Sequence, residues 1–321
     1  METTATFTPA AIGLGRSRRS AGDVIFAAAA RSLGCFVLLL LGAIIISLFV
    51  GGLPSFRAFG IGFLWDISWD PVKQHFGAGV PVFGTLVTSL LALVMAVPLA
   101  FGIAFYLTEI APDWFRRPVG IAVELLAAVP SIIYGMWGFF VIVPFMGQYV
   151  MPVLGDTFAD VPVLGTLFGG APFGTGILTA AMVLAVMVIP FIAATMRDVF
   201  MMVPPVFKES AYGVGCTTWE VMRSIVIPYT RVSVVGGIML GLGRALGETM
   251  AVTFVIGNAN RIATSLFDPG NTIASIVALE FPESPAGSLK LSSLLALGFI
   301  LFVISFIVLA ISRLLLRPRS A

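Results

Sequence analysis

Residues 80–108 read VPVFGTLVTSLLALVMAVPLAFGIAFYLT and contain no Asp, Glu, Lys, Arg or His. An α-helix rises about 1.5 Å per residue, so roughly 20 mostly apolar residues cross the hydrocarbon core of a bilayer. Hydrocarbon cannot hydrogen-bond free backbone groups, and the run lacks the alternation of a barrel strand. The stretch therefore predicts a membrane-spanning helix.

The composition of the whole chain agrees with this prediction. Of 321 residues, 59% are hydrophobic and 11% are charged, and the mean hydropathy is +1.06. Soluble proteins carry about 25% charged residues, so the composition excludes an ordinary soluble enzyme and a disordered chain. The net charge of +2 offers no surface for a nucleic acid or another polyanion. The chain is predicted to be a polytopic membrane protein.

Six stretches have the length and apolar character of a span. They are residues 32–50, 80–108, 118–146, 171–196, 232–257 and 291–312. The predicted fold is an all-α membrane protein with six transmembrane helices. An amphipathic lead-in, residues 24–31, precedes the first span. The polar residues 1–23 contain several arginines and lack a signal-peptide cleavage pattern, so they predict a cytoplasmic tail.

Lysine and arginine set the predicted orientation. With the N-terminus inside, the cytoplasmic segments hold 13 of them, the outer segments hold four, and Arg244 inside a span completes the 18. Both termini are therefore predicted to be cytoplasmic. The predicted organisation is an N-terminal tail (1–23), a first helix with its outer loop (24–79), a five-helix core that includes a cytoplasmic loop at 197–231 (80–312), and a C-terminal tail (313–321).

The cytoplasmic loop 197–231 is longer than a simple connector needs. Pro204 and Pro205 suit the start of a short helix, predicted over residues 206–214 and ended by Gly215. Residues 217–220, TTWE, fit a capping box that begins a second short helix, predicted to end before Pro228. The loop is predicted to form a compact helical hairpin.

The same loop resembles the EAA motif of ABC-importer permeases, E-A-A, three residues, G, nine residues, I-x-L-P. Here Ser210 replaces the second residue of the motif and Ile227 replaces its leucine. The resemblance implies that the loop is a coupling helix that docks in a groove of an ATPase subunit. The residues that match are Glu209, Ser210, Ala211, Gly215 and Pro228. The alternative is an amphipathic hairpin that lies at the membrane interface.

Three further stretches, residues 76–84, 124–135 and 243–251, are similar to the PstC family of phosphate permeases. That resemblance implies a type I ABC-importer permease (MetI-like) fold in a bacterial inner membrane and inward transport of inorganic phosphate. It also implies three kinds of partner: a second, PstA-like permease, a PstB-like ATPase dimer, and a PstS-like phosphate-binding protein outside the membrane.

The chain lacks the residues for its own ATP chemistry. Its only lysines, Lys73, Lys208 and Lys290, are followed by Gln, Glu and Leu, so none completes a Walker A loop. With one histidine and two distant cysteines, no metal site is predicted. We therefore expect a transport subunit without catalytic residues or a cofactor, and ATP and Mg on the partner ATPase.

Two charged residues lie inside a predicted span, which marks them as functional candidates because a charge in lipid is costly. Arg244 and Glu248 are four residues apart, so they are expected on one helical face and within reach of each other. Arginine can grip an oxyanion, and a carboxylate can accept a proton that phosphate carries and sulfate lacks. The resemblance places the pair at the translocation pathway; the alternative is a structural ion pair.

Other residues allow two explanations each. Glu124 can snorkel or pair with another subunit, or it can contact substrate. Pro130 predicts a kink in the third span. Trp65 and Trp69 fit an interfacial aromatic belt, or contact an external partner. At the level of the whole chain, the rival functions are a permease for another oxyanion and a stand-alone secondary transporter or channel.

The orientation can be tested by cysteine labelling. In a chain whose Cys35 and Cys216 are replaced by serine, a cysteine at Ser210 should react with a membrane-impermeant thiol reagent only from the cytoplasmic side. A cysteine at Asp268 should react only from outside. Labelling in the opposite sense would overturn the charge argument and the cytoplasmic position of the loop together.

Overall fold

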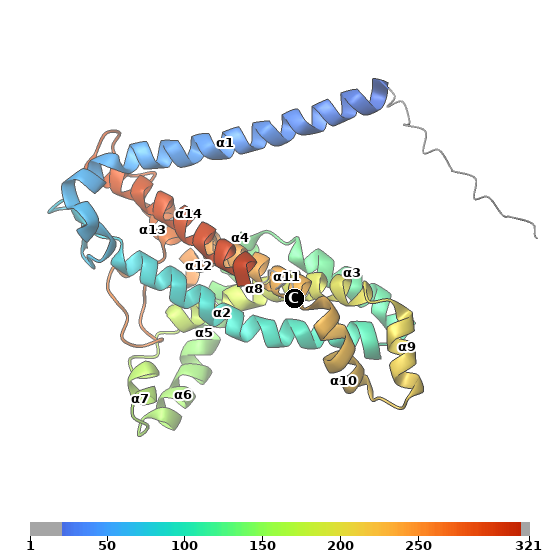
Figure 1. Cartoon of the computed structure of the whole chain (residues 1–321). Coiled ribbons are helices and arrows are strands. Elements are labelled where there is room, and N and C mark those ends of the chain that lie inside the picture. The colour runs from blue at the N-terminus through green and yellow to red at the C-terminus, as the bar shows by residue number, and fades with distance from the viewer. Residues whose placement is uncertain (1–20, 316–321) are drawn as a thin grey trace, which may run out of the picture. The chain divides into compact units, whose positions relative to one another are not determined.

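The computed structural model describes residues 21–315, which form an almost entirely helical chain (Figure 1). The chain divides after Ser47 into two compact units. The first contains the beginning of helix α1 (Ala21–Phe59), and the second contains the end of α1 and every later element. The tails predicted for residues 1–23 and 313–321 lie almost entirely outside the described residues.

Among the described residues, six helices are long and apolar enough to cross a membrane, which confirms the predicted number of spans. They are Ile25–Leu64, Gly79–Ile110, Ser131–Phe158, Ile177–Met201, Thr218–Leu246 and Leu289–Leu314.

Within and between these spans the chain forms shorter elements. The α-helices after α1 are α2 (Gly79–Phe105), α3 (Asp113–Ala127), α4 (Ser131–Trp137), α5 (Val143–Phe145), α6 (Met151–Phe158), α7 (Leu164–Leu167), α8 (Ile177–Met201), α9 (Pro205–Gly213), α10 (Thr218–Val221), α11 (Ile227–Leu246), α12 (Met250–Val255), α13 (Ile273–Glu280) and α14 (Leu289–Leu315). A 3-10 turn covers Gly60–Leu64, and π-helical turns cover Tyr106–Ile110, Gly138–Ile142, Met146–Val150 and Met222–Val226. Two short antiparallel strands, β1 (Trp69–Asp70) and β2 (His75–Phe76), form a hairpin.

The third span differs from its prediction. The structure separates α3 from α4 at Pro130, whose backbone is extended (φ −58°, ψ 136°). Pro130 does more than kink a helix: it ends one helix and starts the next, because a proline disfavours helical geometry in the residue before it. The span therefore runs over Ser131–Phe158 and not over 118–146, and α3 is a separate amphipathic helix.

The fifth span is also displaced, and two expectations about it are wrong. The second short helix does not end before Pro228; helical structure continues from Thr218 to Leu246. The π-helical turn Met222–Val226 precedes Pro228 and widens the helix where a proline ring would otherwise clash with the preceding turn. At the other end the helix stops at Leu246, and the predicted span continued to 257.

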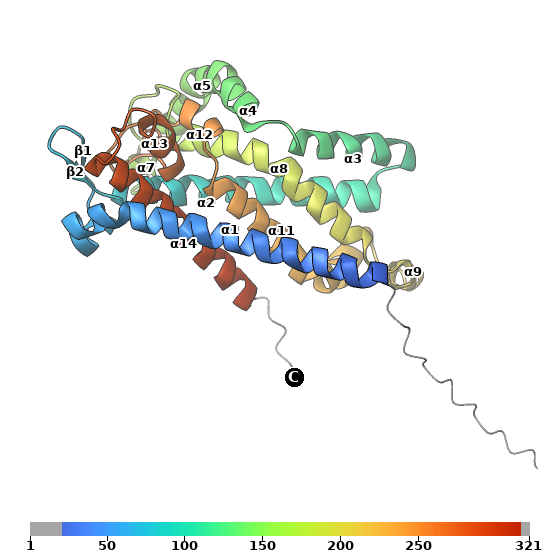
Figure 2. The ribbon, with the colours of Figure 1, turned by 90° about the horizontal axis from the view of Figure 1, so that it is seen from above.

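Helix α8 lies at the centre of the larger unit and packs against α2, α3 and α11 (Figure 2). Every fourth residue of α2 on the packed side is a fully buried alanine: Ala92, Ala96, Ala100 and Ala104. On α11, a Cβ built at Gly237 or Gly241 would lie 2.7–2.8 Å from side chains of α8. Small residues let the helices approach closely, which is how membrane helices associate without a hydrophobic driving force.

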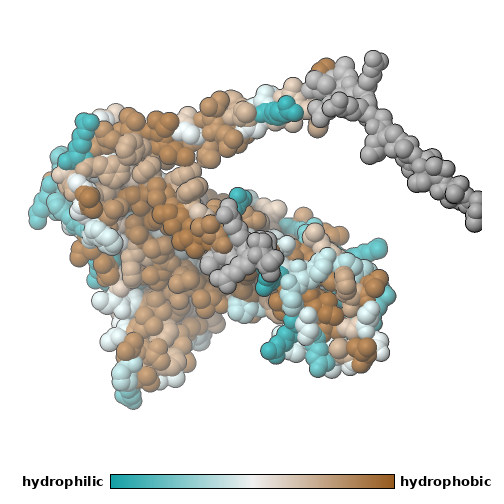
Figure 3. Space-filling view, in the orientation of Figure 1, coloured by the Kyte–Doolittle hydropathy of each residue, from teal (hydrophilic) through white to brown (hydrophobic). Residues whose placement is uncertain are grey.

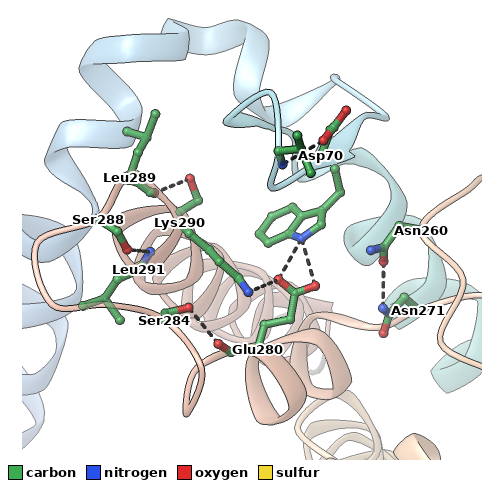
Figure 4. Close-up of polar contacts among 12 residues, drawn as sticks. Asp70, Asn260, Asn271, Glu280, Ser284, Ser288, Leu289, Lys290 and Leu291 are labelled. Carbon is green, nitrogen blue, oxygen red and sulfur yellow. Dashed lines mark hydrogen bonds and ion pairs between the residues drawn. The ribbon is translucent and has the colours of Figure 1, made fainter.

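A second buried cluster lies at the end of the larger unit where the β1–β2 hairpin is found. It is built from Phe63, Trp69 and Phe76 together with apolar residues of α13 and α14. The indole nitrogen of Trp69 donates to both carboxylate oxygens of Glu280 at 3.0 and 3.1 Å, and Lys290 Nζ lies 3.1 Å from Glu280 Oε2 (Figure 4). Trp69 is thus a buried structural residue and not part of an interfacial belt, whereas Trp65 is 80% exposed.

The surface reflects this arrangement. Hydrophobic residues cover most of the helical surface of the larger unit in this view. Hydrophilic residues gather around the β1–β2 hairpin and around α9 and α10 (Figure 3). This banding is what a bilayer requires of a spanning protein.

The close packing of α2 predicts different effects for two Gly→Ala changes in one helix. A Cβ at Gly84 would lie 2.0 Å from the carbonyl oxygen of Asn271, whereas a Cβ at Gly102 has open space. We expect Gly84→Ala to lower the free energy of unfolding by about 1–3 kcal/mol or more and Gly102→Ala to leave it unchanged or slightly raised. Thermal unfolding in detergent measures both, and equal midpoints for the two variants would contradict the packing described here.

Candidate functional site

The chain breaks its helix between α11 and α12. Gly247 ends α11, and Met250 begins α12. Glycine is a poor helix former, and Gly247 is the first residue after α11 whose backbone is no longer helical. The side chain of Glu248 folds back on the new helix, and its Oε1 accepts a hydrogen bond from the Ala251 N–H at 3.2 Å. Glu248 therefore satisfies a backbone donor that the break exposes.

Arg244 lies in the last turn of α11 with few polar contacts. Its guanidinium carbon is 5.8 Å from the centre of the Phe191 ring on α8, a cation–π distance. Its Nε is buried and has no hydrogen-bond partner in the part of the chain that the structure describes. The Nε donor of this guanidinium is therefore left without an acceptor among residues 21–315.

The expectation that Arg244 and Glu248 share one face of a continuous helix is wrong. The helix ends between them, and neither side chain forms an ion pair with the other among the described residues. The sequence indicated the two charges but not the break, because Gly247 is one of several glycines in this stretch and nothing marks it as the end of the helix.

The helix that follows the break at Pro130 lies beside the helix that follows the break at Gly247. A Cβ at Gly135 of α4 would lie 2.9 Å from the Ala251 Cα and 3.1 Å from the Met250 carbonyl oxygen of α12. Tyr134, also on α4, donates its hydroxyl to the carbonyl oxygen of Leu126 at 2.9 Å. Helices α4 and α12, each of which directly follows a break, thus pack against each other and against α8.

The first helix of the α9–α10 hairpin, its turn and its capping box form as the sequence predicted. Helix α9 ends at Gly213, and Gly215 has a positive φ of 92°. Thr217 and Glu220 form the predicted capping box: the Glu220 carboxylate accepts from the Thr217 N–H at 2.7 Å, and Thr217 Oγ1 accepts from the Glu220 N–H at 3.4 Å. The hairpin projects from the ends of α8 and α11 (Figure 1).

The residues of the EAA-like motif separate into two groups. Glu209 and Ser210 are exposed, and Ala211 is 8% exposed and packs into the main core. Pro228 lies within the helical span rather than in the hairpin. Exposed apolar residues around Glu209 were not predicted from the sequence, and they do not belong to a candidate membrane span: Val206, Phe207, Tyr212 and Val214.

Glu124 has a partner inside this chain. Its carboxylate forms an ion pair with Arg197 of α8, and Arg197 also bonds Asp198 at 2.9 Å. Gly120 of α3 leaves the space in which the Arg197 guanidinium lies. The pair joins α3 to α8, so neither snorkelling nor a pair with another subunit is needed to explain Glu124.

A polar cluster stabilises the loop before the β-hairpin. The Ser68 hydroxyl and backbone N–H both donate to Asp66 Oδ1, at 2.5 and 2.9 Å, and His75 Nε2 lies 3.4 Å from Asp66 Oδ2. The hydrogen bonds from Ser68 hold the pKa of Asp66 below its usual value. A lowered pKa stabilises the fold at neutral pH, and this contribution is lost as acid protonates the carboxylate.

Six candidate spans in the described residues, with a projecting helical hairpin, define a multi-pass α-helical membrane protein. The sequence model of one such family matches residues 96–319, and the chain belongs to it: the binding-protein-dependent transport system inner membrane components.

Individual relatives agree with this family. The chain is 58% identical, over 92% of its length and 91% of the relative's, to "Phosphate transport system permease protein PstC" of Pasteurella multocida. It is 56% identical, over 93% and 91%, to the protein of the same name from Mesorhizobium japonicum. The predicted resemblance to PstC proteins is confirmed.

Solved structures confirm the fold. A bacterial alginate ABC transporter in complex with its periplasmic protein superimposes with a TM-score of 0.61 at 16% identity, over 92% of this chain and 95% of that one. The MetNI methionine ABC transporter matches with a TM-score of 0.52 at 16% identity, over 73% and 93%. The chain therefore has the fold of ABC-importer permeases, as predicted.

The hairpin turn gives a prediction with an internal control. Gly213 and Gly215 both have open space around a built Cβ, but only Gly215 has a positive φ. Gly215→Ala should therefore destabilise the turn by about 1–2 kcal/mol, and Gly213→Ala should not. Hydrogen exchange of residues 205–221 should be faster in the first variant alone; unchanged exchange would show that the turn does not need its left-handed glycine.

Proposed function

We propose that this chain is a permease subunit of an ABC importer that moves inorganic phosphate inward, driven by ATP hydrolysis on a separate ATPase subunit. The observation that carries the proposal is the identity of 52–58% with proteins named as phosphate transport permeases, over 92–95% of the chain in four of them. Alternating access to a pathway between the permease subunits accounts for transport without covalent chemistry on this chain.

Arg244 is the residue best suited to contact an anion on this pathway. A guanidinium presents parallel N–H donors that match the edge of an oxyanion, and the buried Nε of Arg244 has no acceptor in the described part of the chain. Its aromatic neighbour Phe191 supports the cation without consuming a donor. The proposed role of Arg244 is to lower the barrier for phosphate at the break between α11 and α12.

Glu248 supplies the opposite chemistry. Its Oε1 caps α12, which leaves further acceptor positions on the carboxylate. Phosphate near neutral pH carries one or two protons and can donate to a carboxylate, whereas sulfate cannot. Glu248 is therefore proposed to disfavour sulfate more than phosphate.

The proposed partners follow from the exposed surfaces. The excess of Lys and Arg in the inner segments favours a cytoplasmic position for the α9–α10 hairpin and, on the same argument, for both termini. The exposed apolar residues around Glu209 and Ser210 suit a groove on a PstB-like ATPase, which would bind the ATP and Mg. A PstA-like second permease and a PstS-like phosphate-binding protein complete the proposed transporter, in a bacterial inner membrane.

Uptake by the reconstituted transporter tests the proposal. Vesicles that contain this chain and its partner subunits should accumulate labelled inorganic phosphate only with ATP and the binding protein, and should not accumulate sulfate. Arg244→Gln should lower the rate by about 10- to 100-fold, because a charged hydrogen-bond donor is lost, whereas Arg313→Gln, the same change at an exposed position, should have little effect.

Three outcomes would contradict the proposal. Uptake without ATP would indicate a secondary transporter or channel, and preferential uptake of sulfate or molybdate would indicate another oxyanion. Full phosphate uptake by a stably assembled Arg244→Gln transporter would remove Arg244 from the pathway.

A further inference from the structure

Lys208 does not face outward with the other charged residue of α9, Glu209. Its Nζ lies 2.5 Å from Oε1 of Glu109, with the side chains only 18% and 6% exposed. The same Nζ reaches the carbonyl oxygen of Phe200 on α8, at 3.4 Å. A lysine on a short projecting helix is thus held inside the protein by a nearly buried carboxylate.

Glu109 occupies a special position at the end of α2. It belongs to the π-helical turn Tyr106–Ile110, which the Ala111 N–H closes on the Tyr106 carbonyl oxygen at 2.8 Å. Such turns insert an extra residue into a helix and re-aim the side chains that follow. Here the turn presents a carboxylate to α9 from a helix that packs along α8 for much of its length.

A second contact joins the same two parts of the molecule. The Trp219 ring of α10 lies edge-on to the Phe105 ring of α2, with centroids 5.9 Å apart. Between them, the ion pair and the ring contact connect both helices of the hairpin to the end of α2. Through the backbone the hairpin is connected only to α8 and, through α10, to α11.

The burial of the ion pair argues that its geometry matters. Two charges removed from water are stabilising only when they are well paired, and an apolar pair of similar size would hold the helices at least as firmly. What the ion pair adds is a penalty for separating the two helices, because each buried charge would then lose its partner.

We propose that the Glu109–Lys208 ion pair fastens α9 to α2, so that a displacement of α9 by a bound ATPase moves α2 directly and not only through the chain connections to α8 and α11. Glu109 and Lys208 are positioning residues in this scheme. The inference rests on the proposed function, because it assumes that α9 is the helix on which the ATPase acts.

The ratio of phosphate transported to ATP hydrolysed tests the proposal in the reconstituted transporter. Glu109→Gln and Lys208→Met should each lower this ratio by about five- to tenfold, with ATP hydrolysis retained. The exchanged variant, Glu109→Lys with Lys208→Glu, should recover much of it. Asp113→Asn, which removes an exposed acid near the same end of α2, should leave the ratio unchanged. A loss of structure alone would lower the yield of the transporter and not the ratio.

Cross-linking provides a second test that does not depend on how the single variants fold. In a chain with Cys35 and Cys216 replaced by serine, Glu109→Cys and Lys208→Cys can be joined by a short bifunctional thiol reagent. If α9 and α2 move together, the linked transporter should take up phosphate at least as well as the unlinked double variant. Arrest of uptake on linking would show that the two helices separate during transport and would overturn the proposal.

The two proposals fail in different ways. If the unmodified transporter takes up no phosphate, the proposed function fails. If it takes up phosphate and the single variants keep the normal ratio, only the role of the ion pair fails.

Discussion

The structure depends on one constraint: inside a membrane, every backbone N–H and C=O needs a partner from the protein. The chain interrupts two of its helices and repairs both with side chains. Tyr134 donates to the Leu126 carbonyl oxygen at the first break, and Glu248 accepts from the Ala251 N–H at the second. Elsewhere in the spans hydroxyls bond back to the preceding turn, as Thr88 and Thr195 do. The breaks are therefore stabilised parts of the fold. The break at Gly247 also determines where Arg244 and Glu248 lie.

The cost of burying a polar or charged group without a partner also distinguishes the charged residues of the chain by their roles. Glu124 and Lys208 find partners on other helices, Arg197 and Glu109, and those pairs hold the α9 end together. Arg244 lies over the ring of Phe191, and its Nε has no acceptor within the described residues. A membrane protein with 11% charged residues has few charges to place, and a buried arginine donor without an acceptor is costly unless something else binds it. This difference favours a transport role for Arg244 and structural roles for the pairs.

The sequence predicted what depends on local composition. The structure contains the six spans, the capping box of the α9–α10 hairpin and the left-handed glycine at Gly215. Each of these predictions used a pattern of about 20 neighbouring residues or fewer. The sequence did not predict the break at Gly247, since several glycines lie nearby and their packing decides which one ends the helix. It also missed that Pro130 would separate two helices, and it ended a helix at Pro228 that a π-helical turn allows to continue.

Contacts between residues that are far apart in the chain could not be predicted from the sequence, for a physical reason. Glu109 and Lys208 are 99 residues apart in the chain. Glu124 and Arg197 are 73 residues apart. The residues next to each member of a pair carry no pattern that indicates its partner. Their pairing depends on how α2 and α3 pack against α8, which small residues such as Ala100 and Gly120 decide. The exposed surface of α9 has the same origin: burial of Ala211 and Lys208 on one side of the helix leaves Val206 and Glu209 on the other. The inward contacts of α9 therefore determine the face that a partner can reach.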